Sequence, residues 1–163
     1  MFKKLVIVCS LLSLFSVANA EILQMKDSID NSKYIYSLSP KQPLQFPKYF
    51  MFKKIINNNS KDYFLTIQND NGVTKTFSCA EYFKMTINDK DIYTFLPTFS
   101  DVSGGKQATI HLSNAIITNF NSINKIVFKI PIFAERSSKL SSYYYFEVPQ
   151  PILEEWKQVI AME

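Results

Sequence analysis

The chain is poor in the residues on which most catalytic and metal sites depend. Its 163 residues include one histidine, two cysteines, three glycines and a single arginine. One histidine excludes a multi-histidine zinc site, and the few glycines do not have the spacing of a phosphate-binding loop. We therefore expect neither a metal nor a cofactor.

The first twenty residues have the three parts of a secretory signal in the right order. Lys3 and Lys4 precede an apolar run over residues 5–17, and Ala18-Asn19-Ala20 is a small-x-small cleavage site. The apolar run is shorter than the roughly 20 residues that a stable membrane anchor needs. We interpret residues 1–20 as a signal peptide, rather than a buried helix or a short anchor, and expect the mature protein in the periplasm or secreted.

Removal of this segment takes away Cys9 and two lysines, which leaves Cys79 as the only cysteine. No internal disulfide is then possible. The net charge falls from +4 to about +2, too little to indicate the concentrated basic face of a nucleic-acid-binding protein. We expect a soluble domain with no membrane span after cleavage and a protein or cell-envelope component as its partner. The oligomeric state stays open.

The rest of the chain is typical of one β-rich domain. Residues 21–33 are polar and read as a flexible N-terminal arm or a weak helix, and the single domain is expected over 34–163. Apolar and β-branched runs predict strands over 34–38, 62–68, 73–79, 82–87, 91–96, 107–112, 125–133 and 141–148, and residues 49–56 form a further apolar and aromatic segment. The pattern favours a mainly β fold, either an antiparallel β-sandwich-like arrangement or a strongly bent sheet with a C-terminal α-helix.

Two segments have the signals of β-hairpins. The stretch 69–72, Asn-Asp-Asn-Gly, separates the runs 62–68 and 73–79, and Asn-Gly is favoured in tight turns with positive φ. Residues 88–90 separate the runs 82–87 and 91–96 in the same way. We expect a hairpin at each place.

A helix is expected at the C-terminal end. Pro149 and Pro151 suit its start, and Glu154 suits its first turn. Ile152 and Trp156 fall on one face together with Val159 or Ile160. The single tryptophan is therefore expected to anchor the helix against the sheet.

Catalytic patterns are weak. Cys79 and His111 could form a nucleophile–base dyad only if the fold brought them together, and a buried cysteine with a surface histidine is the simpler interpretation. Residues 103–106 match the S-x-x-K pattern of penicillin-binding enzymes, but two glycines disfavour the helix that this pattern requires. A small exported enzyme acting on cell-wall or host material is the alternative function.

Aromatic residues give the positive signal. Tyr143 and Tyr145 share one face of a predicted strand, and Tyr49 and Phe50 belong to a second aromatic segment. Such side chains either pack across strands or form recognition surfaces, because they bury a large area at low entropic cost. The preferred hypothesis is a non-catalytic interaction protein with a secretion-accessory, inhibitor or immunity-type role, which binds through Tyr143, Tyr145, Tyr49 and Phe50.

Processing of the leader is directly testable. We expect the protein purified from the native envelope or culture medium to begin at Glu21, because cleavage follows Ala20. Intact-mass measurement and N-terminal sequencing check this. An unprocessed chain recovered from the cytosol would contradict the prediction.

Overall fold

The computed structural model describes residues 21–39, 47–58, 60–69, 75–77, 81–103, 105–134 and 140–163. The expected signal peptide and Cys79 lie outside these residues. The described chain is mainly β, with two antiparallel sheets and a C-terminal helix, as the sequence predicts. In chain order the elements are β1 (Glu21–Lys26), β2 (Lys33–Leu38), β3 (Tyr49–Asn57), β4 (Ser60–Gln68), β5 (Lys75–Phe77), β6 (Phe83–Ile87), β7 (Asp91–Phe95), β8 (Thr98–Val102), β9 (Gly105–Leu112), α1 (Asn114–Thr118), the 3-10 turn η1 (Phe120–Ser122), β10 (Ile126–Ala134), β11 (Leu140–Glu147) and α2 (Gln150–Ala161).

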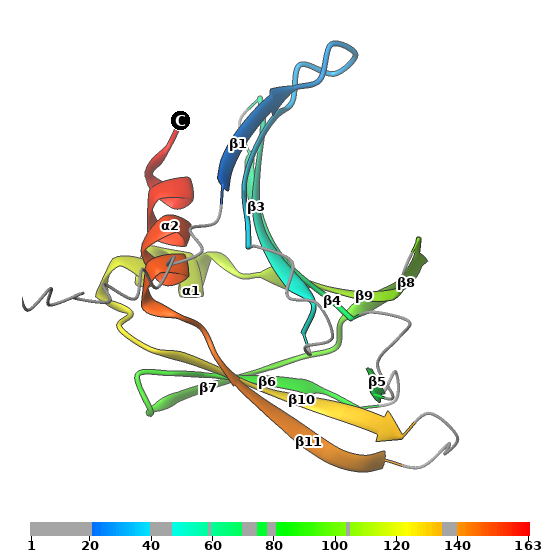
Figure 1. Ribbon diagram of the computed structural model, residues 1–163. Helices are drawn as coiled ribbons and strands as arrows, with labels where there is room; N and C mark the ends of the chain where they lie inside the picture. Colours follow the sequence, from blue (N-terminus) through cyan, green and yellow to red (C-terminus); the bar gives the residue numbers. More distant parts are fainter. Residues whose placement is uncertain are drawn as a thin grey trace, which may run out of the picture.

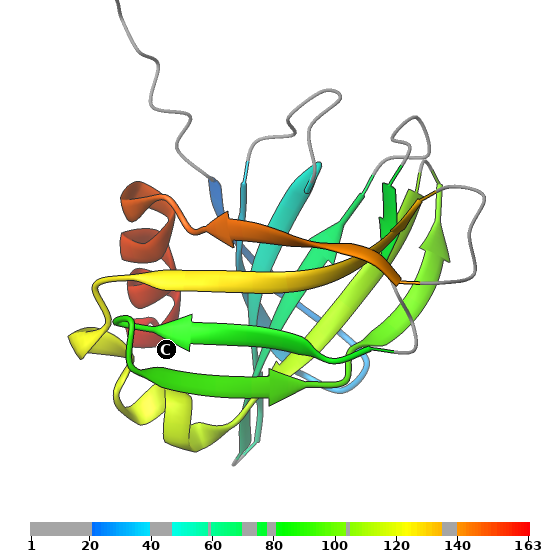
Figure 2. The same ribbon diagram turned by 90° about the horizontal axis from the view of Figure 1, so that it is seen from below.

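The two sheets pack on each other through apolar inner faces. Sheet A has six strands in the order β1-β2-β3-β4-β9-β8, and sheet B has the order β11-β10-β6-β7 with β5 also paired to β10. Figure 1 shows that sheet A is strongly bent and that sheet B and α2 lie on the same side of it. Figure 2 shows the strands of sheet B crossing in front of those of sheet A. The fold is therefore sandwich-like, with one sheet that is also strongly bent.

The segment 21–33 is not an arm or a helix. It contributes β1, which pairs with β2 in register from Glu21 opposite Leu38 to Lys26 opposite Lys33. The polar residues that suggested an arm form the turn of this hairpin: Asp27 accepts a hydrogen bond from the Ile29 amide (2.7 Å) and Asp30 accepts one from the Ser32 amide (2.8 Å). Acidic side chains that bond to backbone two residues further on are typical of tight turns.

The hairpin expected around residues 69–72 is also wrong. β4 pairs with β3 and β9 in sheet A, whereas β5 pairs with β10 in sheet B. Asn69 ends β4 by exchanging hydrogen bonds with Lys106: its amide donates to the Lys106 carbonyl (3.0 Å), and its side-chain oxygen accepts from the Lys106 amide (2.9 Å). β4 is one of the two middle strands of sheet A and pairs with a long strand on each side, β3 and β9.

The second expected hairpin is confirmed. β6 and β7 pair antiparallel with Ile87 opposite Asp91. Asn88 and Asp89 both have positive φ, 50° and 58°, and the Lys90 amide donates to the Ile87 carbonyl across the turn (3.0 Å). Short polar residues tolerate this conformation better than other non-glycine residues do.

The period-two pattern of β10 is confirmed by burial. Alternate residues of β10 point into the space between the sheets and are almost fully buried: Ile126, Phe128, Ile130 and Ile132. They pack with inner-face residues of sheet A such as Leu65 to form a continuous apolar core.

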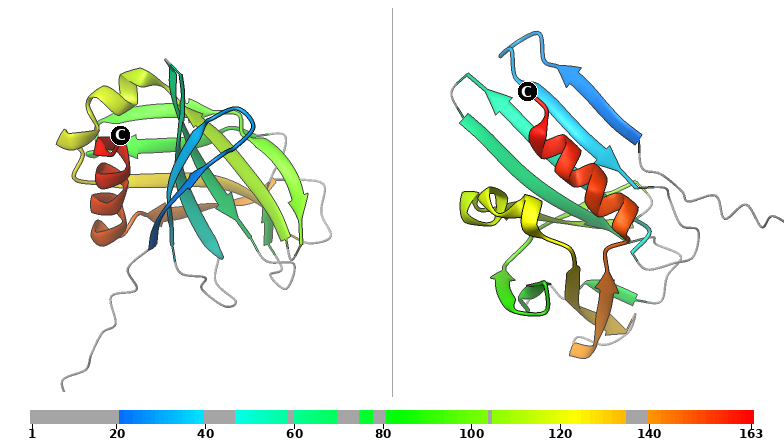
Figure 3. Two further views of the ribbon diagram at one scale, coloured as in Figure 1. Left: turned by 90° about the horizontal axis from the view of Figure 1, so that it is seen from above. Right: turned by 90° about the vertical axis from the view of Figure 1, so that its left-hand side faces the viewer.

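Helix α2 and Trp156 also lie where the sequence predicts them. Trp156 is 1% exposed, and its ring stacks on Phe52 at 5.3 Å and meets Phe50 edge-on at 5.9 Å. Figure 3 shows α2 lying along the strands at one end of sheet A. The tryptophan thus anchors the helix to the bent sheet.

A buried lysine, which no sequence pattern predicts, completes the attachment of α2. Lys54 is fully buried on β3. Its ammonium donates hydrogen bonds to the carbonyls of Ile160 (2.7 Å) and Met162 at the end of α2, where helix carbonyls have no partner within the helix. Burial lowers the pKa of Lys54, because an apolar surrounding disfavours the charged form.

The Lys54→Met substitution tests this attachment. We expect the free energy of unfolding at neutral pH to fall by about 1–2 kcal/mol, since the helix carbonyls lose a charged donor. The folded state binds this proton less tightly than the unfolded chain, so wild-type stability gains relative to the variant as pH rises toward the ordinary lysine pKa of 10.5. Urea unfolding of both proteins from pH 7 to 10.5 measures the difference between their free energies of unfolding. If this difference became smaller as the pH rises, the predicted role of Lys54 would be contradicted.

Candidate functional site

Tyr143 and Tyr145 stand on the solvent side of sheet B. They alternate along β11 with Tyr144 and Phe146, which pack against the core. Tyr143 is 40% exposed and Tyr145 is 62% exposed. One face of this strand is therefore core, as expected, and of the two alternatives left open for the other face the structure has the exposed one.

A lysine lies between these two rings. Lys129 of β10 is the register partner of Tyr145, and its Nζ atom is 4.0 Å from the Tyr143 ring centroid and 5.7 Å from that of Tyr145. A cation over an exposed aromatic ring is stabilised by about 0.5–1 kcal/mol. The contacts hold one positive charge in a defined position between two rings.

A second lysine stands beside the first on the same face. Lys84 of β6 is the direct register partner of Lys129. Within the described residues neither lysine has a carboxylate at ion-pair distance. Like charges directly opposite each other on a sheet are destabilising, so this pair costs stability. We call Tyr143, Tyr145, Lys129 and Lys84 the tyrosine–lysine face.

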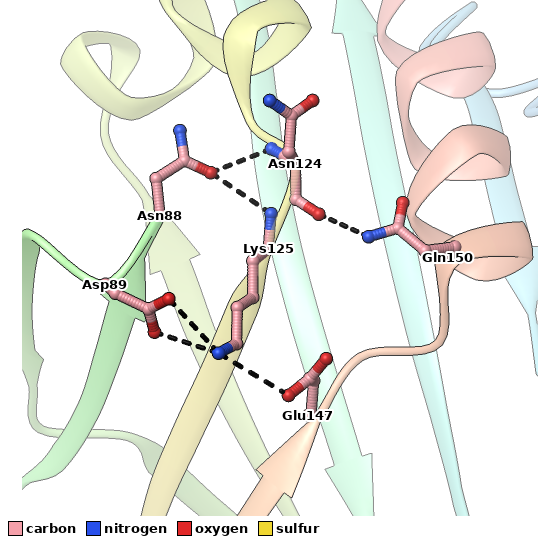
Figure 4. A network of polar contacts seen from close by, with 6 residues as sticks. All are labelled: Asn88, Asp89, Asn124, Lys125, Glu147 and Gln150. Carbon is pink, nitrogen blue, oxygen red and sulfur yellow. Dashed lines mark hydrogen bonds and ion pairs between the residues drawn. The ribbon is translucent and has the colours of Figure 1, made fainter.

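Two carboxylates of sheet B, those of Asp89 and Glu147, pair with another lysine. The Lys125 ammonium lies 3.0 Å from one Asp89 carboxylate oxygen, and Glu147 is 3.8 Å from the same ammonium (Figure 4). The hydrogen bond and charge of Asp89 raise the pKa of Lys125. Glu147 follows Tyr145 on the outer side of β11, so its pairing with Lys125 leaves the charge of Lys129 and Lys84 uncompensated.

Hydrogen bonds beside this ion pair connect three elements of the fold. The Asn88 side-chain oxygen accepts hydrogen bonds from the amides of Asn124 (2.8 Å) and Lys125 (3.1 Å), and the Gln150 side chain donates to the Asn124 carbonyl (Figure 4). These bonds connect the β6–β7 turn to the start of β10 and to the start of α2. They fix the strands that carry the tyrosine–lysine face.

Tyr49 and Phe50 do not belong to this face. Phe50 is 7% exposed and packs on Trp156 and Phe146 in the core, so its expected role in an exposed surface is wrong. Tyr49 is half-buried on β3, and its hydroxyl donates to the Gln68 side chain. Burial raises the pKa of Tyr49. The structure therefore brings together only two of the four residues expected at the site.

The outer side of sheet A carries a surface that sequence reasoning missed. Strand register places Leu23, Tyr36, Lys53, Phe64 and His111 in one row across β1, β2, β3, β4 and β9. Among the described residues no helix or strand covers this side, which faces away from sheet B and α2 (Figure 1). Period-two patterns show which residues share a face but not which strands are neighbours, so the row was not visible in the sequence.

His111 is a surface residue of that row. Its ring stacks on Phe64 at 5.0 Å, and its Nε2 atom is 3.4 Å from an Asp62 carboxylate oxygen. Cys79, its possible catalytic partner, lies outside the described residues. Ser103 lies in a turn and Lys106 on β9, so the S-x-x-K match lacks the helix that would place both side chains on one face.

The described residues contain neither a cluster of metal ligands nor a membrane-spanning helix. Among the described residues no group of three or more histidine, cysteine, aspartate or glutamate side chains could hold a metal ion, and no helix there has the length and apolar character to cross a membrane. Comparisons of the chain with protein-family models, curated proteins and solved structures give no match.

The lysine pair makes a prediction about stability. Lys84→Glu replaces a like-charge cross-strand pair by an opposite-charge pair, and we expect the free energy of unfolding to rise by about 0.2–1 kcal/mol. Urea unfolding at low and high salt measures this, because added salt screens exposed charges and should reduce the gain. A loss of stability in Lys84→Glu would contradict the register that places the two lysines opposite each other.

Proposed function

We propose that this chain is an exported, non-catalytic binding protein whose partner docks on the tyrosine–lysine face. The observation that supports the proposal most strongly is the arrangement of Lys129 between two exposed tyrosine rings, with Lys84 beside it. Exposed tyrosines bury a large area at low entropic cost, and such residues often dominate binding energy.

The charges favour an acidic partner. An uncompensated lysine pair lowers stability in the unbound protein, and carboxylates of a partner would remove that cost while forming charge-assisted hydrogen bonds. Like charges usually do not face each other across neighbouring strands. A departure from this preference that lowers stability is typical of a functional surface. The partner chemistry that fits is a segment with acidic side chains and an apolar or aromatic flank that packs on the tyrosines.

The sheet edge favours a protein over other envelope components. β11 is the edge strand of sheet B in the part of the sheet that the structure describes. An extended peptide can add to such an edge through main-chain hydrogen bonds, while its side chains contact the neighbouring face. We propose this mode of docking. It is compatible with a secretion-accessory, an inhibitor and an immunity-type role.

The enzyme alternative has less support. His111 is exposed on the outer side of sheet A, and its contacts are Asp62 and Phe64. A nucleophile–base pair needs both groups beside a substrate position. Labelling of Cys79 by a thiol reagent in the native protein separates the alternatives, because a Cys nucleophile must react before denaturation.

The proposed function is tested by capture from an envelope extract with the mature protein as bait. We expect Tyr143→Ala and Tyr145→Ala each to weaken the captured complex at least about tenfold, as central aromatic contacts do. Lys84→Glu should weaken it as well, even though we expect that variant to be more stable. The dissociation constant for the identified partner, measured by calorimetry, gives the comparison.

Tyr36→Ala is the matched control, because this tyrosine lies on the outer side of sheet A. It should bind like the wild type, and affinity should fall with rising salt. Unchanged binding by folded Tyr143→Ala and Tyr145→Ala proteins would remove the tyrosine–lysine face from the interface. Loss of binding in Tyr36→Ala alone would move the interface to sheet A.

A further inference from the structure

A separate open cleft of about 460 Å³ lies at the end of sheet A, between the β3–β4 turn and helix α1. Its apolar walls come from Ile56 of β3 and Ile117 of α1. Polar side chains line the rest of it: Asn58, Ser60, Lys61, Tyr63, Asn114 and Thr118. No residue of the tyrosine–lysine face takes part, so the cleft is independent of the proposed docking surface.

Tyr63 is the most informative residue of this cleft. It is only 5% exposed, yet its hydroxyl forms no hydrogen bond with any described residue. Within the described chain Trp156 Nε1 is the single side-chain polar atom that is both inaccessible and unpaired, so the Tyr63 hydroxyl reaches solvent through the cleft. Burial raises the pKa of Tyr63, and the phenol is therefore a neutral hydrogen-bond donor at physiological pH.

The other polar groups also offer donors. Within the described residues the side-chain amides of Asn58 and Asn114 have no hydrogen-bond partner. The Ser60 hydroxyl already donates to the Asn57 carbonyl, and the Thr118 hydroxyl donates to the Asn114 carbonyl. The cleft thus presents a phenol and two amides to a ligand that can accept hydrogen bonds.

The one charge on the described residues that line the cleft is positive. Lys61 carries it, and the ammonium of Lys54 lies 5.8 Å from the Tyr63 ring centroid. The Glu163 carboxylate pairs with Lys61 at 3.2 Å, but its side chain is 86% exposed. A ligand carboxylate could replace so exposed a partner at little cost, because surface ion pairs are weak.

We propose that this cleft binds a small organic acid. The carboxylate would accept hydrogen bonds from Tyr63 and the asparagine amides and pair with Lys61, while Ile56 and Ile117 contact its carbon skeleton. Small-molecule sites commonly combine apolar walls with a few convergent polar groups. The apolar walls favour an organic carboxylate over inorganic phosphate, which has no carbon skeleton to bury.

The test is a titration of the ¹⁵N-labelled mature protein with sodium butyrate, sodium phosphate and sodium chloride at constant ionic strength. We expect saturable shifts of amides in residues 56–63 and 114–118 with butyrate, and weaker binding of phosphate. Tyr63→Phe removes only the hydroxyl and should weaken butyrate binding about fivefold to tenfold. Lys61→Gln should weaken it to a similar extent.

Tyr93→Phe is the control, because Tyr93 is a partly buried tyrosine of β7 in sheet B, and its binding of butyrate should match the wild type. Three results would overturn the assignment: no saturable shift with butyrate, tighter binding of phosphate than of butyrate, or wild-type affinity in both folded Tyr63→Phe and Lys61→Gln proteins. Capture of a partner on sheet B has no bearing on any of these results.

Discussion

Side chains alternate along β10 and β11 between the apolar core and the outer side of sheet B. This alternation places Ile126, Phe128 and Ile130 between the sheets and, on the opposite side, sets Lys129 against Tyr145. A slip of one residue would exchange the two faces of a strand. It would expose apolar side chains and bury a lysine without a partner, so core packing itself fixes the tyrosine–lysine face in place.

That face combines a stabilising contact with a destabilising one. The cation–π contact of Lys129 with Tyr143 orders its charge, whereas Lys84 opposite Lys129 adds repulsion. The network of Asn88 and Asn124 holds the strands that carry these residues. If a partner of complementary charge docks there as we propose, it gains from charges that are already ordered, and the entropic cost of binding is lower.

Much of the fold follows from local patterns. The alternation of β10, the β6–β7 turn and the position of Trp156 could all be predicted, since each depends on a few neighbouring residues. Strand pairing could not be predicted around Asn69, because the choice of β9 over β5 as the neighbour of β4 depends on contacts distant in sequence. The role of Lys54 could not be predicted for the same reason, because its hydrogen-bond partners are distant in sequence and lie at the end of α2.

The residues of the candidate site also fall into those that the sequence predicts and those that only the structure shows. Tyr143 and Tyr145 could be found because a period of two puts both on one face of a strand. Phe50 was misassigned because a run of aromatic residues does not show which of them points inward. Lys129 and Lys84 became part of the site only through strand register, which no pattern within one strand specifies.

The proposed docking on the tyrosine–lysine face can be tested by hydrogen exchange of the backbone amides, compared between the free protein and its complex with a captured partner. The account predicts new protection in β11, at the edge of sheet B, with little change in β1 to β4. Protection confined to β1 to β4, with β11 exchanging as in the free protein, would contradict it.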